Sequence, residues 1–280
     1  MLEMEELRMM LIELGMVRAA EILEAKLTLA TEASSSYVAF SRDLLGHELT
    51  SRRLRAHEVR MRVAGLPYKK RISDFDFSWC PSIDRGVIDD LCSLAFVTSA
   101  SNVVLLGPPG TGKSHLAIGL AIEAIEGGHS VYFTTLSRIA DDLSHGTSGA
   151  KYQKYIKPKV LVIDEIGYRA IDRGAANAFF EVIAARYETG AVILTSNKGF
   201  GAWGELFPDV VLATAVLDRL LHHCTVINIK GNSYRLRDRV AQGIYTSPEA
   251  ATAHREGAVV TADSDITSSA FKTPAGGGPS

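Results

Sequence analysis

The chain of 280 residues has only three cysteines, which are widely spaced and belong to no paired motif: Cys80, Cys92 and Cys224. Neither a disulfide framework nor a zinc site is therefore expected, and the pattern is typical of a protein kept in a reducing compartment. The chain also lacks any apolar run near the roughly 18 residues that a membrane span requires. It does not open with a basic segment followed by an apolar one, as a secretory leader does. These absences predict a cytoplasmic protein without a membrane partner.

A strong excess of one charge is also missing, because the formal net charge is −2 at pH 7. The charges are nevertheless unevenly spread. Residues 1–36 hold seven acidic and three basic side chains, whereas residues 37–72 hold nine basic and three acidic ones. Such asymmetry is typical of a surface that meets phosphates, although a solvated helix face has the same composition. Under the first interpretation, the candidate contacts to nucleic acid are Arg52, Arg53, Arg55, Arg60 and Arg62.

The sequence divides into three parts. Apolar residues recur at helical spacing from Leu7 onward, and a third helical stretch, roughly residues 37–63, ends before Gly65 and Pro67. We therefore predict a small all-helical module over residues 1–66, with a role in binding a partner or DNA. Strands and helices alternate in the second part, residues 67–242. The last part, residues 243–280, is rich in Ala, Thr, Ser, Gly and Pro and is expected to be disordered.

The second part predicts an α/β fold. Its five candidate strands are apolar runs without strict alternation, as expected when helices cover both faces of a sheet: 102–107, 130–134, 160–164, 191–196 and 225–229. Helical patterns follow at 113–126, 136–143, 175–188 and 212–222. This alternation implies a five-stranded parallel sheet flanked by helices, with right-handed crossovers.

A phosphate-binding loop connects the first strand to its helix. The segment fits the pattern G-x-x-x-x-G-K-[ST] without a mismatch: Gly107, Pro108, Pro109, Gly110, Thr111, Gly112, Lys113 and Ser114. Glycines allow the loop to curl so that backbone N–H groups and the helix N-terminus face phosphates. The lysine would pair with the β- and γ-phosphates and the serine hydroxyl would ligate Mg²⁺. The loop therefore predicts ATP and Mg²⁺ as cofactors.

Two further strands end in polar residues. VLVIDE places Asp164 where a carboxylate can hold Mg²⁺ or its waters, and Glu165 can polarise an attacking water. Asn197, after the next strand, has an amide that can hold the water or the γ-phosphate. The alternatives are a solvated acidic pair and an ordinary turn residue. Arg219 lies on the following helix and is either an arginine finger or part of a surface ion pair with Asp218.

The order of the segments GPPGTGKSH, VLVIDEIGY, ILTSN, LDRLLHH and IKGNSYRLR resembles the AAA+ ATPases of the IstB type. These are helper proteins of bacterial insertion sequences and relatives of the DnaC helicase loaders. The resemblance extends from about Asp74 to Arg239. It implies a P-loop NTPase of AAA+ type in which Lys113 and Ser114 form Walker A, and Asp164 and Glu165 form Walker B.

The resemblance further implies that Asn197 is sensor 1 and that Arg219 acts on ATP bound by a neighbouring subunit. Catalysis would thus rest on Lys113, Glu165, Asn197 and Arg219. The segment 74–77 would flank the adenine, and Arg235 or Arg237 would be sensor 2. Family members bind duplex DNA with weak sequence preference, form ATP-bridged homo-oligomers on it and engage a transposase for target capture. This chain departs from the pattern in its short, Gly/Ser-rich segment 144–158. We expect no room for the full lid domain of many AAA+ proteins, which agrees with the IstB type.

Two other functions stay open. A DnaC-like helicase loader would use the helical module to hold a replicative helicase, and co-purification with a helicase rather than a transposase would identify it. A small-molecule kinase would use the same P-loop but would need an acceptor pocket and a lid.

Three features are expected to be structural. Trp79 and Trp203 are expected to pack rather than to stack on bases. His222 and His223 would point about 100° apart on a helix. With no third ligand expected nearby, no metal site is predicted there.

Overall fold

The computed structural model describes residues 2–144, 146, 149–167, 171–231 and 233–234. The predictions for the tail 243–280, for Arg235 and Arg237, and for the absence of a lid concern residues outside these ranges. Within them, no helix is long and apolar enough to cross a membrane.

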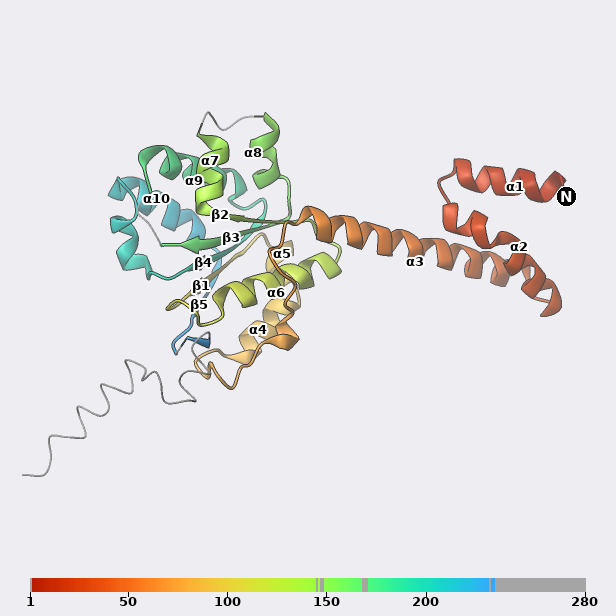
Figure 1. Ribbon diagram of the computed structural model, residues 1–280, viewed down its shortest axis with the longest axis horizontal. Helices are drawn as coiled ribbons and strands as arrows, with labels where there is room; N and C mark the ends of the chain where they lie inside the picture. The colour runs from red at the N-terminus through yellow and green to blue at the C-terminus, as the bar shows by residue number, and fades with distance from the viewer. Residues whose placement is uncertain (1, 145, 147–148, 168–170, 232, 235–280) are drawn as a thin grey trace, which may run out of the picture. The chain divides into compact units, whose positions relative to one another are not determined.

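Three helices begin the chain (Figure 1): α1 Leu2–Glu13, α2 Val17–Glu32 and α3 Tyr37–Val63. The start of α3 is fixed by Ser36, whose Oγ accepts a hydrogen bond from the Ala39 amide at 3.2 Å. A small apolar cluster that includes Leu11, Leu23 and Leu44 joins the three helices. These helices match the prediction for the start of the chain, while the domain boundary at residue 66 stays a prediction.

The predicted five-stranded parallel sheet is confirmed. Its strands are β1 Asn102–Leu106, β2 Val131–Thr135, β3 Val160–Ile166, β4 Ala191–Ser196 and β5 Cys224–Asn228. Their spatial order is β2-β3-β4-β1-β5, and every neighbouring pair is parallel. Strand β4 therefore lies between β1 and β3. The carboxyl ends of these three strands meet at one edge of the sheet, which positions the site.

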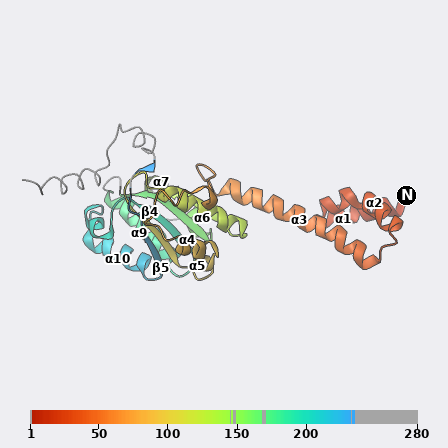
Figure 2. The ribbon, with the colours of Figure 1, turned by 90° about the horizontal axis from the view of Figure 1, so that it is seen from below.

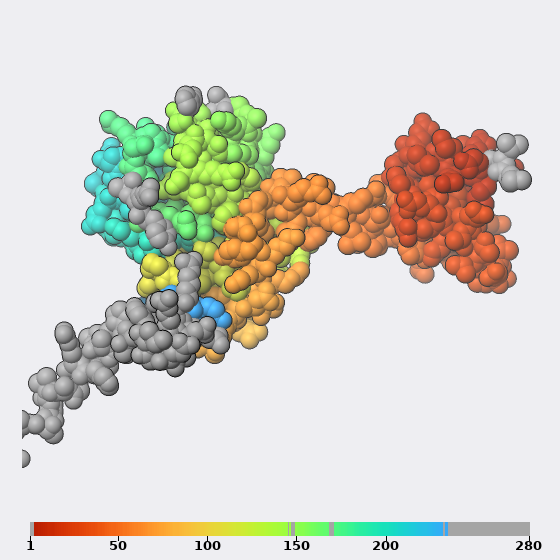
Figure 3. Space-filling view, in the orientation of Figure 1, coloured from red at the N-terminus to blue at the C-terminus, as the bar shows by residue number. Residues whose placement is uncertain are grey.

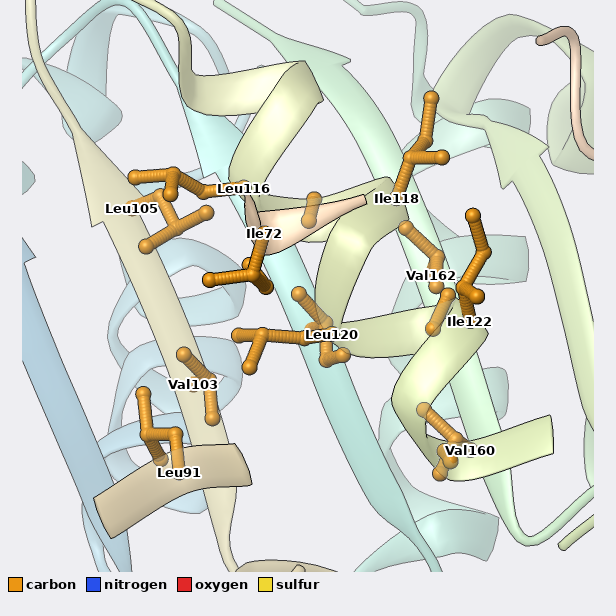
Figure 4. Packing of buried hydrophobic residues seen from close by; sticks show 14 of the residues in the cluster. Ile72, Leu91, Val103, Leu105, Leu116, Ile118, Leu120, Ile122, Val160 and Val162 are labelled. Atoms are coloured by element: carbon orange, nitrogen blue, oxygen red, sulfur yellow. The ribbon is translucent and has the colours of Figure 1, made fainter. Parts of the chain in front are cut away.

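Helices cover both faces of the sheet (Figures 1 and 2). The elements that connect and flank the strands are η1 Ile72–Asp74, α4 Arg85–Cys92, α5 Ala95–Thr98, α6 Lys113–Glu126, α7 Leu136–Leu143, α8 Gly149–Ile156, α9 Arg173–Arg186, η2 Phe200–Glu205 and α10 Val210–Leu221. Alternate strand residues face opposite ways, as the pleat requires. Val103 and Val162 pack with α4 and α6, as Figure 4 shows, whereas Val104 and Leu161 pack with α7, α9 and α10. Trp203 is buried in the apolar cluster on the face covered by α7, α9 and α10, as expected for a packing residue.

The segment 144–158 contains more helix than its Gly/Ser-rich sequence suggested. Helix α8 occupies Gly149–Ile156 and lies beside α7 (Figure 1), and both belong to the green region of the surface in Figure 3. The buried Tyr155 hydroxyl donates a 2.5 Å hydrogen bond to Asp142 on α7. The buried Arg186 guanidinium donates to five backbone carbonyls, those of Tyr155, Ile156, Pro158, Lys159 and Ala191. These bonds hold the connection from α8 to β3 in place.

Candidate nucleotide and magnesium site

The predicted phosphate-binding loop connects β1 to α6 and requires glycine at close backbone contacts. Gly107 has φ 153° and Gly112 has φ 93°, where L side chains are strained. A Cβ atom at Gly107 would lie 2.3 Å from the Ile229 carbonyl oxygen, and one at Gly112 would lie 2.5 Å from Phe75 Cε2. Only glycine therefore fits at these two positions. A loop of this kind can curl so that its backbone N–H groups face phosphates.

The loop is curled around one of its own carbonyl groups. Lys113 Nζ donates to the Pro108 oxygen at 2.7 Å, and Thr111 Oγ1 donates to the same oxygen at 2.9 Å. The Lys113 side chain is largely buried at the start of α6. Pairing with phosphates would require its ammonium group to exchange the Pro108 carbonyl for phosphate oxygens, a charge-assisted and therefore stronger contact.

Side-chain oxygens from two elements, α6 and β3, lie close together beside the loop. Ser114 Oγ, in the first turn of α6, donates to Asp164 Oδ1 at 2.9 Å. Asp164 belongs to β3 and is only 7 % exposed. A serine hydroxyl and an aspartate carboxylate are hard oxygen ligands of the type that Mg²⁺ prefers, usually together with waters and phosphates. These two residues fit the ion and would hold it; when bound, it would neutralise charge on the phosphates.

Thr195, in the buried strand β4, completes this arrangement and was not predicted from the sequence. Its Oγ1 donates a short hydrogen bond to Asp164 Oδ1 and accepts one from the Glu165 backbone N–H at 3.0 Å. One hydroxyl thus orients the carboxylate that would hold the metal and fixes the backbone of the next residue. The signal in the sequence is a hydroxyl at the end of the strand beside β3, but it is informative only once the strand order is known.

Glu165 has a different environment from Asp164. Its backbone has φ 66°, which is uncommon for a residue other than glycine, and its side chain is exposed. It lines a cavity of about 650 Å³ between α7 and the start of α9, together with Ser137, Asp141 and Asp172. A carboxylate beside the metal ligand and open to solvent can orient a water molecule.

Asn197 follows β4 at the same edge. Its backbone N–H donates to the Ile166 oxygen at 3.2 Å, while the Ser196 oxygen accepts from the Gly107 amide at 3.2 Å. The end of β4 therefore touches both the start of the phosphate loop and the end of β3. Among the described residues, the buried Oδ1 of Asn197 has no hydrogen-bond partner. An amide without a partner beside the loop is consistent with a role in contacting a ligand or water.

The segment 74–77 packs against the loop from outside the sheet. Phe75 lies against Gly112, and its ring centroid is 5.3 Å from that of His115 and 4.9 Å from that of Phe77. The prediction that this segment flanks the adenine stays a prediction, but its contact with the loop is direct.

Comparison with known proteins identifies the family. A family model described as IstB-like ATP binding protein matches residues 9–242. The chain belongs to this family. It is 43 % identical over 247 residues to a protein named for ATP binding in insertion sequence IS21 of Pseudomonas aeruginosa, covering 87 % of this chain and 93 % of that one. The corresponding protein of IS5376 from Geobacillus stearothermophilus is 44 % identical over 227 residues, covering 80 % and 90 %.

Among solved structures, that of DnaI aligns with 59 % of this chain and 90 % of its own, with 21 % identity and a TM-score of 0.48. The family match confirms the IstB-type resemblance, and this chain is an IstB-like ATP-binding protein.

Arg219 lies far from the phosphate loop of its own IstB-like chain. It is near the end of α10, where its Nη1 donates to the Ala215 oxygen and its guanidinium lies 5.0 Å from the centroid of the Phe180 ring. The next residue, Leu220, accepts a hydrogen bond from Asn102 at the beginning of β1. The loop follows the other end of β1, roughly 13 Å away at about 3.3 Å per residue. The structure therefore does not bring Arg219 to the chain's own site.

The five arginines predicted to contact nucleic acid all lie on α3, but their surroundings differ. Arg52 and Arg55 donate to Oε1 of the buried Glu48, at 2.9 and 3.3 Å, and Arg52 also donates to the Gly15 carbonyl at 3.1 Å. Arg52 therefore joins α3 to the corner between α1 and α2, whereas Arg55 pairs with Glu48 within α3. Arg53 and Arg62 are exposed and have no ion pair within the described ranges. Arg60 is half-buried, and its Nε has no partner there.

The expectation that no third ligand lies near His222 and His223 is wrong. Glu188, which follows the end of α9, places Oε1 at 4.0 Å from His222 Nδ1 and 3.8 Å from His223 Nε2. The sequence separation of more than 30 residues hid this contact, which arises because α9 and α10 pack together.

Proposed function

We propose that this IstB-like chain is an ATP-dependent, DNA-binding transposition helper that hydrolyses ATP to ADP and phosphate. The observation that carries the proposal is the network of hydrogen bonds at the carboxyl ends of β1, β3 and β4, which are neighbours in the sheet. Asp164 and Ser114 provide metal-binding oxygens, Thr195 orients Asp164, and the exposed Glu165 is held by the same hydroxyl.

Each residue has a distinct task in this proposal. Lys113 would pair with the phosphates, and Ser114 with Asp164 would hold Mg²⁺, which would supply positive charge beside the phosphate oxygens. Glu165 orients and polarises a water molecule, because its carboxylate is open to solvent beside the site. Asn197 holds that water or the γ-phosphate through its side-chain amide.

The distance between Arg219 and its own phosphate loop supports action on a neighbouring subunit. An arginine at the amino-terminal edge of the sheet is too far from a nucleotide bound by its own chain, but it can contact a nucleotide bound by a second chain packed against that edge. ATP bound between two subunits would then be completed by Arg219 of the neighbour, and hydrolysis would require a homo-oligomer.

DNA and a transposase are the proposed partners. The relatives belong to insertion sequences, which favours a transposase over a replicative helicase. The DNA contacts are best supported for the exposed Arg53 and Arg62, whereas Arg52 and Arg55 are engaged with Glu48 and keep only part of their hydrogen-bonding capacity. Phosphate contacts would make DNA affinity fall steeply with salt.

Phosphate release with and without duplex DNA tests the activity, with Lys113→Ala as the negative control. The wild-type chain should release phosphate, and the Lys113→Ala variant should lose ATP binding in calorimetry. Unchanged ATP affinity in this variant would refute the assignment of the loop. Retention of a replicative helicase rather than a transposase would favour the loader. Phosphate transfer to a small molecule in place of water would favour the kinase.

A further inference from the structure

The ends of α9 and α10 carry a cluster of metal-ligating side chains outside the nucleotide site. Glu188, His222 and His223 each offer one ligand atom, and these atoms lie within 4.8 Å of one another. The three residues come from two segments that the packing of α9 on α10 brings together. From these distances we propose that they form a binding site for a divalent first-row transition-metal ion such as Zn²⁺, Co²⁺ or Ni²⁺.

The chemistry of the three side chains fits such an ion. Imidazole nitrogen and carboxylate oxygen are ordinary ligands of Zn²⁺ and its neighbours, at about 2.0–2.2 Å. Three ligands around one ion at these bond lengths lie roughly 3.3–3.6 Å apart in tetrahedral geometry. The present separations of 3.8 and 4.0 Å from the Glu188 carboxylate need only small side-chain rotations. All three side chains are about half exposed, so that these rotations meet little resistance and water can complete the coordination.

The surroundings of the cluster favour a cation. The Tyr187 hydroxyl lies 2.9 Å from His222 Nδ1, the nitrogen that is 4.0 Å from the Glu188 carboxylate, and this contact would open when that nitrogen ligates the ion. The carboxylates of Glu188 and Asp218 both act electrostatically on Tyr187, so they place negative charge beside the two imidazoles. The guanidinium of Arg219, which adds positive charge nearby, lies over the Phe180 ring.

Metal binding would connect the end of α9 directly to the end of α10. The site would thus brace the helix pair that carries Arg219, independently of whether the chain hydrolyses ATP. The three ligands come together only in the folded chain. An ion that binds them there, and not in the unfolded chain, should raise the melting temperature.

Calorimetric titration of the full chain, free of any histidine tag, with Co²⁺ in excess Mg²⁺ tests the site. Excess Mg²⁺ occupies the oxygen ligands beside the phosphate loop. We expect one equivalent of saturable Co²⁺ binding, visible d–d absorption without a thiolate charge-transfer band, and a higher melting temperature. The double variant His222→Ala with His223→Ala should lose all three effects, and Glu188→Gln should weaken the binding.

Two control variants separate this site from other candidate ligands. His47→Ala removes an exposed histidine that also lies beside a carboxylate, Asp43, at 3.6 Å, and it should bind Co²⁺ like the wild type. Cys224→Ser removes the thiol adjacent in sequence to His223 and should also leave binding unchanged. The proposal is overturned if the wild type shows no saturable binding, or if the double histidine variant binds with unchanged stoichiometry and affinity.

Discussion

The substitution Thr195→Val tests whether one buried hydroxyl organises the candidate catalytic site. Valine has nearly the same shape as threonine and also suits a strand, so the change removes hydrogen bonds while packing is retained. The Asp164 carboxylate would lose a charge-assisted donor, and the Glu165 amide would lose its acceptor. The backbone of Glu165, at φ 66°, would then be held by fewer contacts in a conformation that costs about 1–3 kcal/mol.

The expected loss follows from these two bonds. A hydrogen bond to a charged group contributes about 1.5–3 kcal/mol, and an amide left buried without a partner costs about 1–3 kcal/mol. Because the two effects overlap at one side chain, we expect a loss of about 2–4 kcal/mol, or a fall in melting temperature of roughly 5–15 °C.

Activity should fall together with stability. We expect phosphate release to decrease about 10–100-fold, as is usual when a residue that orients a metal ligand is removed. Calorimetric melting and a phosphate-release assay measure the two effects, and Thr195→Ser, which keeps the hydroxyl, is the matched control. If the valine variant melts and turns over like the serine variant, the hydroxyl does not hold the site together.

Three further predictions concern other parts of the chain. Glu165→Gln should bind ATP with unchanged affinity but release phosphate at least about 100-fold more slowly, as expected for loss of a general base; wild-type turnover would remove Glu165 from the mechanism. Arg219→Ala should regain phosphate release when mixed with Lys113→Ala, because each variant supplies the half that the other lacks, and failure at every mixing ratio would contradict action between subunits. Glu48→Gln should lower the free energy of unfolding by about 1–3 kcal/mol at pH 7. Although burial raises the Glu48 pKa, hydrogen bonds from the Ala19 amide and Arg52 outweigh it and lower that pKa. This contribution is therefore complete above the unfolded-state pKa near 4.3 and is lost as the pH falls through the folded-state pKa, which acid titration of both proteins would measure.

The sequence predicted those features that depend on contiguous residues. The five strands and the helix after the phosphate loop are found within one or two residues of their expected bounds, because each is a buried apolar run or a periodic pattern bounded by polar residues. The loop was equally accessible, since its glycines, Lys113 and Ser114 are consecutive. The helix α3 matches its predicted range because Ser36 and Gly65 flank it with ordinary start and stop signals.

Features that depend on which elements become neighbours were not accessible. The role of Thr195 requires β4 to lie beside β3, and alternation of strands and helices does not specify that order. The engagement of Arg52 requires Glu48 to be buried against the corner of α1 and α2, which composition cannot reveal. Glu188 likewise reaches the two histidines only through the packing of α9 against α10.

The strand order also supports the proposal that Arg219 acts between subunits. Placing β4 between β1 and β3 gathers the phosphate loop, Asp164, Glu165 and Asn197 at the carboxyl edge of the sheet. The same topology sends α10 back across the sheet, so that Arg219 ends beside the opposite edge, where β1 begins. Because no rotation of a side chain spans the length of a strand, the proposed action of Arg219 would require the nucleotide of another molecule. The separation of the two edges is thus the structural reason to expect ATP to act as a bridge between subunits.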